Sequence, residues 1–402
     1  MMTAITGTRR TLLSSLLGAH AILVALLFIN SPGTGDVTIF VGWTNTILRY
    51  GIVDGYARNA TVQPPLYAVI FWVIGTAAHW LHVVVFFAYK TSLFVAWLAT
   101  GLALRLWTSD AVVVWAVLLA LVPNSLALGY FDIYLAPPLL VALWAAREQR
   151  WVLFSTAFAV FVLIKAQAII LAPFAVLYAI AVVSRQGNRL AMAAKLLLPV
   201  AVVVLTFGFT FGAEMALWVT RATSDPFFSG NALNACWLIT HWVRAMHPEK
   251  FGGLSPDGTA TFIIASGTFF PRTLMRILFL AVYGSIVALF WRRARTFEAY
   301  VLFSFVGYLA YFILNTGVHE NHLFYGALLA VVLWLTERRY WLHALVCCLA
   351  ANVNLILFYG LSGDPPPFSR VVGIDLAVPF ALINVAFFLV CAAELKGNWE
   401  FS

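Results

Sequence analysis

The chain has 402 residues, of which 63% are hydrophobic and only 10% are Asp, Glu, Lys or Arg, and its mean hydropathy is +0.93. Soluble domains carry about 25% charged residues, so this composition excludes a soluble domain and predicts a polytopic, all-α membrane protein. The net charge of +8 is divided among small clusters between apolar runs. That pattern orients membrane helices and argues against a nucleic-acid partner.

The first apolar segment, 11–30, is about long enough to cross a bilayer and follows Arg9 and Arg10. These arginines predict a cytoplasmic N-terminus. The sequence Ala19-His-Ala21 is typical of a signal-peptide cleavage site, but the apolar run continues through Ile29. We therefore expect an uncleaved anchor.

A first external loop, 31–83, follows this span and opens with Asp36. Its next residues place an apolar set on one helical face, which predicts an amphipathic helix lying flat in the membrane interface. That face consists of Val37, Phe40, Val41, Thr44, Ile47 and Leu48. Asp54 stands between two glycines and predicts a turn. The apolar run 65–81 is short, so we expect a helix embedded in the outer leaflet that does not cross.

Eleven further spans are predicted, which with the first makes twelve and leaves both termini inside. They are 84–106, 111–128, 133–146, 151–164, 168–183, 196–213, 273–291 and 297–314, and three more that end at Arg339, near Ser362 and at Lys396. Basic clusters at alternate ends support this orientation. We interpret 1–402 as a single transmembrane domain with a second long external segment at 214–272.

The predicted orientation brings a set of ionisable residues to the outer face. They are Asp36, Lys90, Asp132, Lys165, His319 and Glu320. Ionisable groups at membrane depth are functional candidates. Gln167 belongs to the same turn as Lys165, and His322 to the same turn as His319. Asn231 and Asn234 lie in the long external segment.

Four stretches resemble the C-type (GT-C) glycosyltransferases, which take sugars from polyprenyl-phosphate carriers. The first is the external loop, with its acid, flat helix, Gly51-x-x-x-Gly-Tyr turn and Gln63-Pro-Pro-Leu-Tyr67. The others are Gly129-Tyr-Phe-Asp132 with Lys165-Ala-Gln167, Gly317-Val-His-Glu-Asn-His322, and Asn231-Ala-Leu-Asn234 through Trp237. Tyr130 and Asn321 replace a Gln and a basic residue that the family usually carries.

The resemblance implies an inverting transferase at the outer face of a bacterial cytoplasmic membrane, with Asp36 as general base. It implies donor-phosphate contacts from Lys90, Lys165, His319 and His322. The supporting or acceptor-binding residues would be Asp132, Gln167, Glu320, Asn231 and Asn234. The partners would be a polyprenyl-phosphate sugar, a glycan, lipid or protein acceptor, and membrane lipids. It implies no cofactor and leaves metal dependence open.

Each assignment has a structural alternative. Asp36 could cap the flat helix, and Asp132 and Lys165 could form a salt bridge at the membrane surface. Lys90 could extend to the lipid headgroups, and the two histidines could cap a helix or bind a metal.

Two other functions fit the same composition. A transporter or flippase of a lipid-linked glycan would use the charged residues as an ion-coupled path, although related halves are not visible. A ligase that moves a whole glycan would keep much of the same architecture. The four cysteines have no Cys-x-x-Cys spacing and predict no metal site or disulfide framework.

Overall fold

The computed structural model describes residues 2–224, 226–255, 258–264, 269–293, 296–364, 370–371 and 374–396. Asp225, Asp257 and Arg295, which belong to predicted loops, lie outside these ranges. Within them the regular secondary structure is helical, apart from one two-residue antiparallel pair, β1 (Arg370–Val371) with β2 (Ile374–Asp375).

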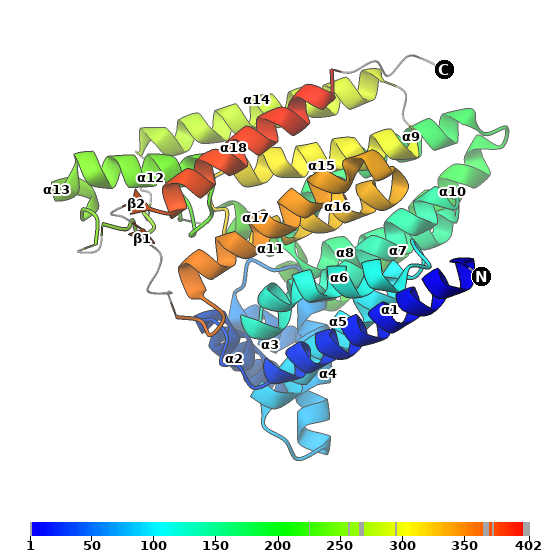
Figure 1. The fold of residues 1–402 in the computed structure, drawn as a ribbon, viewed down its shortest axis with the longest axis horizontal. Helices are drawn as coiled ribbons and strands as arrows, with labels where there is room; N and C mark the ends of the chain where they lie inside the picture. The colour runs from blue at the N-terminus through cyan, green and yellow to red at the C-terminus, as the bar shows by residue number, and fades with distance from the viewer. Residues whose placement is uncertain are drawn as a thin grey trace. The chain divides into compact units, whose positions relative to one another are not determined.

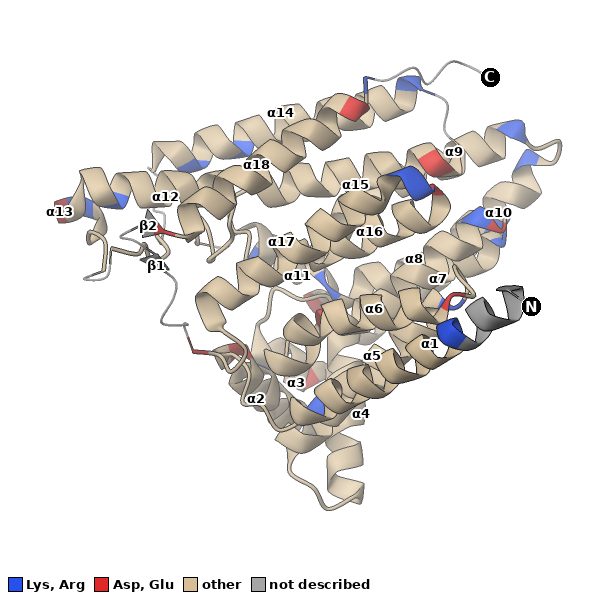
Figure 2. Cartoon of the chain, in the orientation of Figure 1, with Lys and Arg blue, Asp and Glu red and all other residues tan. Residues whose placement is uncertain are grey.

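Eight helices of the described chain are long and apolar enough to cross a membrane. They are Arg9–Leu27, Val85–Leu104, Ala166–Arg185, Arg189–Phe211, Phe270–Arg292, Phe297–Leu314, Arg338–Tyr359 and Ala377–Glu394. Lys and Arg lie mostly near helix ends (Figure 2). These helices confirm an all-α, multi-pass membrane protein.

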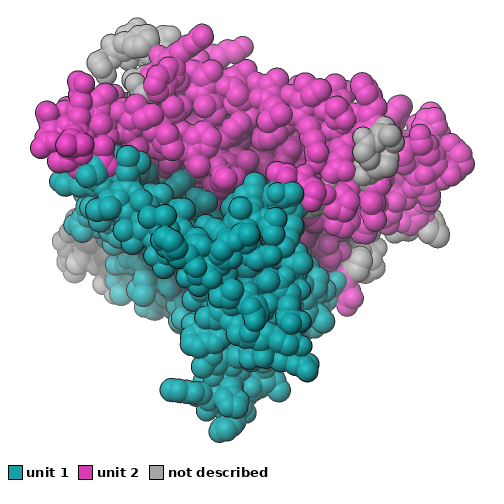
Figure 3. Space-filling view, turned by 180° about the vertical axis from the view of Figure 1, so that it is seen from behind, with its two compact units in different colours: residues 1–166, 194–222, 361–363 teal, residues 167–193, 223–360, 364–402 magenta. Residues whose placement is uncertain are grey.

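The chain forms two compact units (Figure 3). Unit 1 comprises Met1–Ala166, Ala194–Ala222 and Leu361–Gly363. Its elements are α1 (Met2–Leu27), α2 (Gly35–Tyr50), α3 (Ile52–Asn59), α4 (Leu66–Trp80), α5 (Val85–Leu104), α6 (Ala111–Val122), the π-helix η1 (Pro123–Ala127), η2 (Phe131–Leu135), α7 (Ala136–Arg147), α8 (Trp151–Ile164), α11 (Glu214–Thr223) and most of α10 (Arg189–Phe211).

Unit 2 comprises Gln167–Ala193, Thr223–Gly360 and Asp364–Ser402. Its elements are η3 (Ala166–Leu171), α9 (Ala172–Arg185), α12 (Ala235–Met246), α13 (Pro248–Phe251), α14 (Phe270–Arg292), α15 (Phe297–Leu314), η4 (Glu320–His322), α16 (Leu323–Thr336), η5 (Arg338–Tyr340), α17 (Trp341–Tyr359) and α18 (Ala377–Glu394) (Figure 1). Helix α15 is its core: every residue from Phe297 to Leu314 except Glu298 is buried, and α14, α16 and α18 pack against it.

Every predicted span coincides with helix in the structure, but the helices differ in length. Helices α7 and α16 have only 12 and 14 residues, whereas crossing a bilayer takes about 20. The count of twelve crossings therefore stays a prediction.

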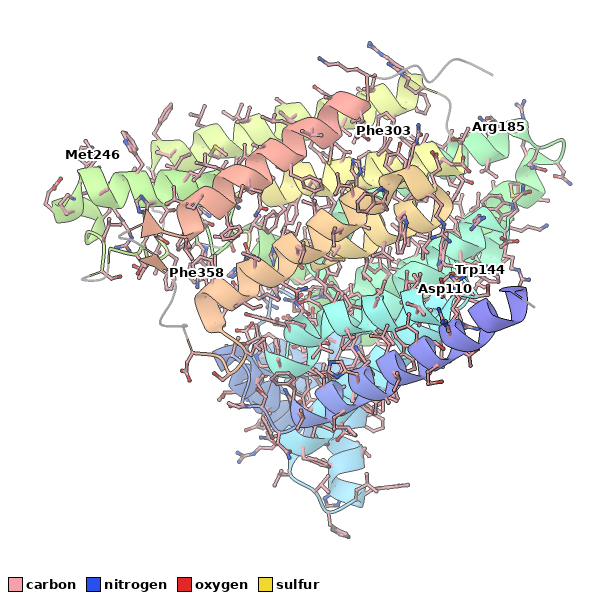
Figure 4. The ribbon with its side chains drawn as sticks, in the orientation of Figure 1. Asp110, Trp144, Arg185, Met246, Phe303 and Phe358 are labelled. Carbon is pink, nitrogen blue, oxygen red and sulfur yellow. The ribbon has the colours of Figure 1, made fainter. Side chains whose placement is uncertain are left out.

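Helices α1 and α6 run parallel in unit 1. At their N-terminal ends, Arg10 forms an ion pair with Asp110, which lies beside α1 (Figure 4). Just past their C-terminal ends, Ser31 Oγ donates a hydrogen bond to the Ala127 carbonyl (2.8 Å). The contacts at the two ends fix the relative direction of the helices.

The predicted first external loop, 31–83, folds onto the helices of unit 1 through aromatic side chains. The predicted apolar face of α2 is buried at Val37, Phe40, Thr44 and Ile47. The Phe40 ring meets Phe131 edge-on at 5.0 Å and also contacts rings from α4 and α5, those of Phe71 and Tyr89. Burying one such ring contributes about 1.5–3 kcal/mol, so the loop is anchored by packing.

Candidate functional site

The site of unit 1 is built around the turn at Gly129, which joins η1 to η2. Gly129 has φ +76°, and its carbonyl accepts a hydrogen bond from the Tyr89 hydroxyl (2.7 Å). A Cβ there would lie 2.5 Å from Val37 Cγ2. Only glycine allows this backbone conformation together with the close approach of α2. The turn thereby holds the start of the first loop against α5.

Asp132 and Lys165 form an ion pair beside this turn. Lys165 Nζ lies 2.5 Å from Asp132 Oδ1, and the two residues are 2% and 0% exposed. Their positions follow from local breaks in helix: Asp132 lies in the 3₁₀ turn η2, and Lys165 adopts extended backbone directly after α8. The predicted pair is confirmed, and protein covers both side chains, so it is a buried pair rather than a solvent-exposed one. Removing one partner of a buried pair costs about 3–5 kcal/mol.

Lys90 contributes a second buried cation. Its side chain is fully buried, and Nζ donates a hydrogen bond to the Leu126 carbonyl in the π-helix. π-helical turns often occur at functional sites. Extension of Lys90 to the headgroups is therefore wrong. Among the described residues, no carboxylate forms an ion pair with Lys90.

Asp36 lies at the same turn, one residue before Val37. It is half-buried in the first turn of α2, and its carboxylate and that of Asp132 both act electrostatically on the Tyr89 hydroxyl. Thr34, not Asp36, occupies the N-cap position, so the capping interpretation of Asp36 is wrong. Asp54 is exposed and lies inside α3, which corrects the predicted turn.

The site of unit 2 begins with His319 and His322, which cap each other's backbone. The His319 side chain accepts from the backbone of His322, and His319 N–H donates to His322 Nδ1 (3.2 Å). The structure thus contains the capping arrangement that the structural alternative requires. Gly230 packs against this turn, because a Cβ there would lie 2.4 Å from His319 Nδ1.

The ring of His322 is engaged at both nitrogens. Because Nδ1 accepts from His319 N–H, a neutral ring carries its proton on Nε2. Nε2 lies 2.8 Å from the Gln167 amide group, whose Oε1 is otherwise without a partner. The hydrogen bonds therefore favour the amide orientation in which Oε1 accepts from Nε2–H. His322 then has no ring proton left for a phosphate.

Asparagine side chains connect the long segment that was predicted to be external to this turn. Asn354 Nδ2 donates to the Glu320 carbonyl (3.0 Å), and its Oδ1 accepts from Leu233 N–H (2.6 Å). Asn234 Nδ2 donates to the Phe312 carbonyl (2.9 Å), and Asn231 Nδ2 donates to the Tyr359 hydroxyl (3.0 Å). The structure therefore gives Asn234 a positioning role. Glu320 is buried.

Sequence reasoning missed Tyr89 and Asn354. Asn354 could have been identified from the sequence, since an amide inside the apolar run of α17 needs a hydrogen-bond partner. Tyr89 could not, because an aromatic residue beside Lys90 is ordinary in a membrane helix.

No group of three or more His, Cys, Asp or Glu side chains in the described part of the chain could hold a metal ion. The metal interpretation of His319 and His322 therefore lacks the further ligands it needs. Protein-family models and curated proteins provide no match to this chain.

Proposed function

We propose that the protein is an inverting GT-C-type glycosyltransferase that takes a sugar from a polyprenyl phosphate at the outer face of a bacterial cytoplasmic membrane. The observation that carries the proposal is the convergence of Asp36, Lys90 and the buried Asp132–Lys165 pair on one turn. A base and buried cations are the groups that this reaction needs.

In the proposed reaction, the acceptor hydroxyl attacks the anomeric carbon and loses its proton to Asp36. The bond between the anomeric carbon and the phosphate oxygen breaks, and the polyprenyl phosphate leaves as an anion. Because that anion needs no proton, one carboxylate is sufficient. Attack from the face opposite the leaving group inverts the anomeric configuration.

The leaving phosphate gains negative charge on its bridging oxygen in the transition state. A preorganised cation there stabilises the transition state more than the bound donor. Lys90 fits this role best because its bond to a carbonyl leaves its charge uncompensated. Lys165 is already paired with Asp132. The phosphate contact proposed for His319 belongs to unit 2 and stays a separate proposal. His322 is dropped, because its neutral ring donates its one proton to Gln167.

The parallel course of α1 and α6 supports the proposed sidedness. If both helices cross, an odd number of crossings must separate them, and α5 alone supplies one. A crossing by α4 would make the two helices antiparallel. The Gly129 turn and Asp36 then belong to the membrane face opposite the Arg10–Asp110 ion pair, which is the expected outer face.

One observation favours a transporter instead. A fully buried ion pair in an apolar body is a feature of ion-coupled paths, and Asp132–Lys165 is such a pair. The two functions are separated by chemistry, because a transporter returns its lipid-linked sugar unchanged.

The test is transfer by purified protein supplied with polyprenyl-phosphate hexoses and pentoses, with glycan, lipid and protein acceptors. Asp36→Asn should fold normally and lower transfer by about two to four orders of magnitude, the range for a lost general base. Asp54→Asn is the matched control, because Asp54 is an exposed carboxylate of the same loop. Near-normal turnover by Asp36→Asn would remove Asp36 as the base.

A further inference from the structure

Two turns at one end of unit 1 carry exposed arginines. The turn after α5 contains Arg105 and Trp107, and the turn between α7 and α8 contains Arg147 and Arg150. Trp107 Nε1 donates a hydrogen bond to the Leu140 carbonyl of α7 (3.2 Å), and the Arg147 guanidinium lies over the Trp107 ring. These contacts place the two turns side by side.

Both arginines of the second turn are stacked on indole rings. The Arg147 guanidinium lies 5.7 Å from the centre of the Trp107 ring, and that of Arg150 lies 4.6 Å from the centre of the Trp144 ring, which is labelled in Figure 4. A cation within about 6 Å of a ring centre is attracted to the face of the ring. Arg150 N–H also donates to the Ala145 carbonyl (2.7 Å), which fixes the turn. The guanidiniums are therefore oriented, although both arginines are exposed.

The charges of these two guanidiniums are not neutralised by the protein. Among the described residues, no carboxylate forms an ion pair with Arg147 or Arg150, whereas Arg10, at the start of α1, is paired with Asp110. The ionisable residues of the two turns and of the start of α1 are Arg9, Arg10, Arg105, Arg147, Arg150, Asp110 and Glu148. Positive charge therefore exceeds negative charge at this end of unit 1.

The depth of the side chains indicates the class of ligand. Trp107 follows the apolar helix α5, and Trp144 lies in the last turn of α7. Tryptophan at helix ends is typical of the membrane interface, so guanidiniums stacked on these rings lie at the level of the lipid headgroups. A planar guanidinium donates two parallel hydrogen bonds to a phosphate. The excess of positive charge favours an anionic headgroup over a zwitterionic one.

We propose that Arg147 and Arg150, stacked on Trp107 and Trp144, bind the phosphodiester group of an anionic phospholipid. This site differs from the general effect of basic clusters on topology, which needs charge alone, because it needs planar guanidiniums held on rings. It is independent of the proposed transferase function, since no residue of the Gly129 turn takes part.

The test measures binding of fluorescent lipids to the purified full-length protein in dodecyl maltoside. The probes are NBD-labelled phosphatidylglycerol, which is anionic, and NBD-labelled phosphatidylcholine, whose choline cation neutralises the same phosphate. Phosphatidylglycerol should bind about 10-fold more tightly or better. Excess inorganic phosphate, compared with chloride at the same ionic strength, should not displace it, because the site recognises a phosphate that is carried by a lipid.

Two double variants separate the stacked guanidiniums from charge alone. Arg147→Gln/Arg150→Gln should lower the affinity for phosphatidylglycerol by roughly 10- to 30-fold, which is about 5-fold for each arginine near a lipid surface. Arg147→Lys/Arg150→Lys keeps the charge and the topology signal but loses the planar guanidinium, so it should lower the affinity by roughly 3- to 10-fold. Both positions are exposed, so thermal unfolding without added lipid should match wild type.

Arg339→Gln is the matched control. Arg339 is also exposed and lies 4.8 Å from the centre of the Tyr340 ring, but its Nε is 2.7 Å from a Glu337 carboxylate oxygen. Because this arginine already has an anionic partner, its loss should change the affinity for phosphatidylglycerol by about 2-fold or less.

The outcomes are decided by binding alone. Equal binding of the two lipids, displacement of phosphatidylglycerol by inorganic phosphate, or a preference that survives Arg147→Gln/Arg150→Gln would each overturn the site. Wild-type affinity in the lysine variant would overturn it as well, because charge alone would then be sufficient. A large loss with glutamine, a partial loss with lysine and no loss in Arg339→Gln would support the site, whether or not the protein transfers sugars.

Discussion

At the scale of single residues, His319 has two roles to separate. It caps the turn at η4 and is also the proposed phosphate donor of unit 2. His319→Ala removes both functions, so loss of activity with that variant alone would not distinguish them. Asparagine is among the best capping residues, which makes His319→Asn the informative change.

We predict that His319→Asn keeps thermal stability close to wild type and lowers turnover by roughly 10- to 1,000-fold, the range for a lost transition-state donor. His319→Ala should lose stability as well, by about 1 kcal/mol for a lost cap. Thermal unfolding and turnover are measured on the same preparations. If His319→Asn turns over normally, His319 is a cap only.

How far the site could be predicted depends on the kind of residue. Carboxylates and lysines in an apolar chain stand out in composition, so Asp36, Lys90 and the Asp132–Lys165 pair were identified. The burial of Lys90, Asp132 and Lys165 was not predicted, because position relative to a helix end does not reveal which other elements pack over a side chain.

At the scale of elements, the sequence predicted helix positions well because long apolar runs specify them directly. The helix at α2 followed from its apolar face, and its flat position in the membrane interface stays a prediction. The helix at Asp54 was missed because glycine on both sides of a short polar segment indicates a turn. In the structure Gly51, at φ +84°, separates α2 from α3, and Gly55 packs against Ile47. Here tertiary packing outweighs local preference.

The contact between the starts of α1 and α6 gives a prediction on pH. Burial tends to raise the pKa of Asp110, but hydrogen bonds from the Arg10 guanidinium and from Val112 N–H outweigh it and hold the pKa below its usual value. The carboxylate therefore stabilises the fold above its unfolded pKa of about 3.9. That stabilisation is lost as the pH falls through the lower folded value.

We predict that Asp110→Asn, which keeps a capping side chain, lowers stability at neutral pH by about 0.2–1 kcal/mol, the usual value for an exposed pair. Arg10 is 69% exposed, so salt should reduce the effect. Thermal unfolding of wild type and variant is compared from pH 7 to pH 3. The two curves should converge at low pH, and a constant difference would show that the charge is not responsible.

At the scale of the whole molecule, the direction of each crossing decides which residues can share a face. The described cysteines give a low background for thiol labelling, since Cys236, Cys347 and Cys391 are buried and Cys348 is half-buried. Single cysteines can therefore be introduced at exposed turns and reacted with a membrane-impermeant maleimide in intact cells.

We predict that Asp54→Cys and Asp364→Cys are labelled from outside, whereas Glu148→Cys and Arg339→Cys are labelled only after the membrane is opened. All four positions are exposed, so a difference in labelling reports sidedness rather than burial. Glu148 is the decisive position because its side depends on α4, whose 15 residues are too few for an ordinary crossing. Labelling of Glu148→Cys in intact cells would mean that α4 crosses. Lys165 and Asp132 would then lie at the inner face, away from a donor presented outside, and the transferase assignment of that pair would be untenable.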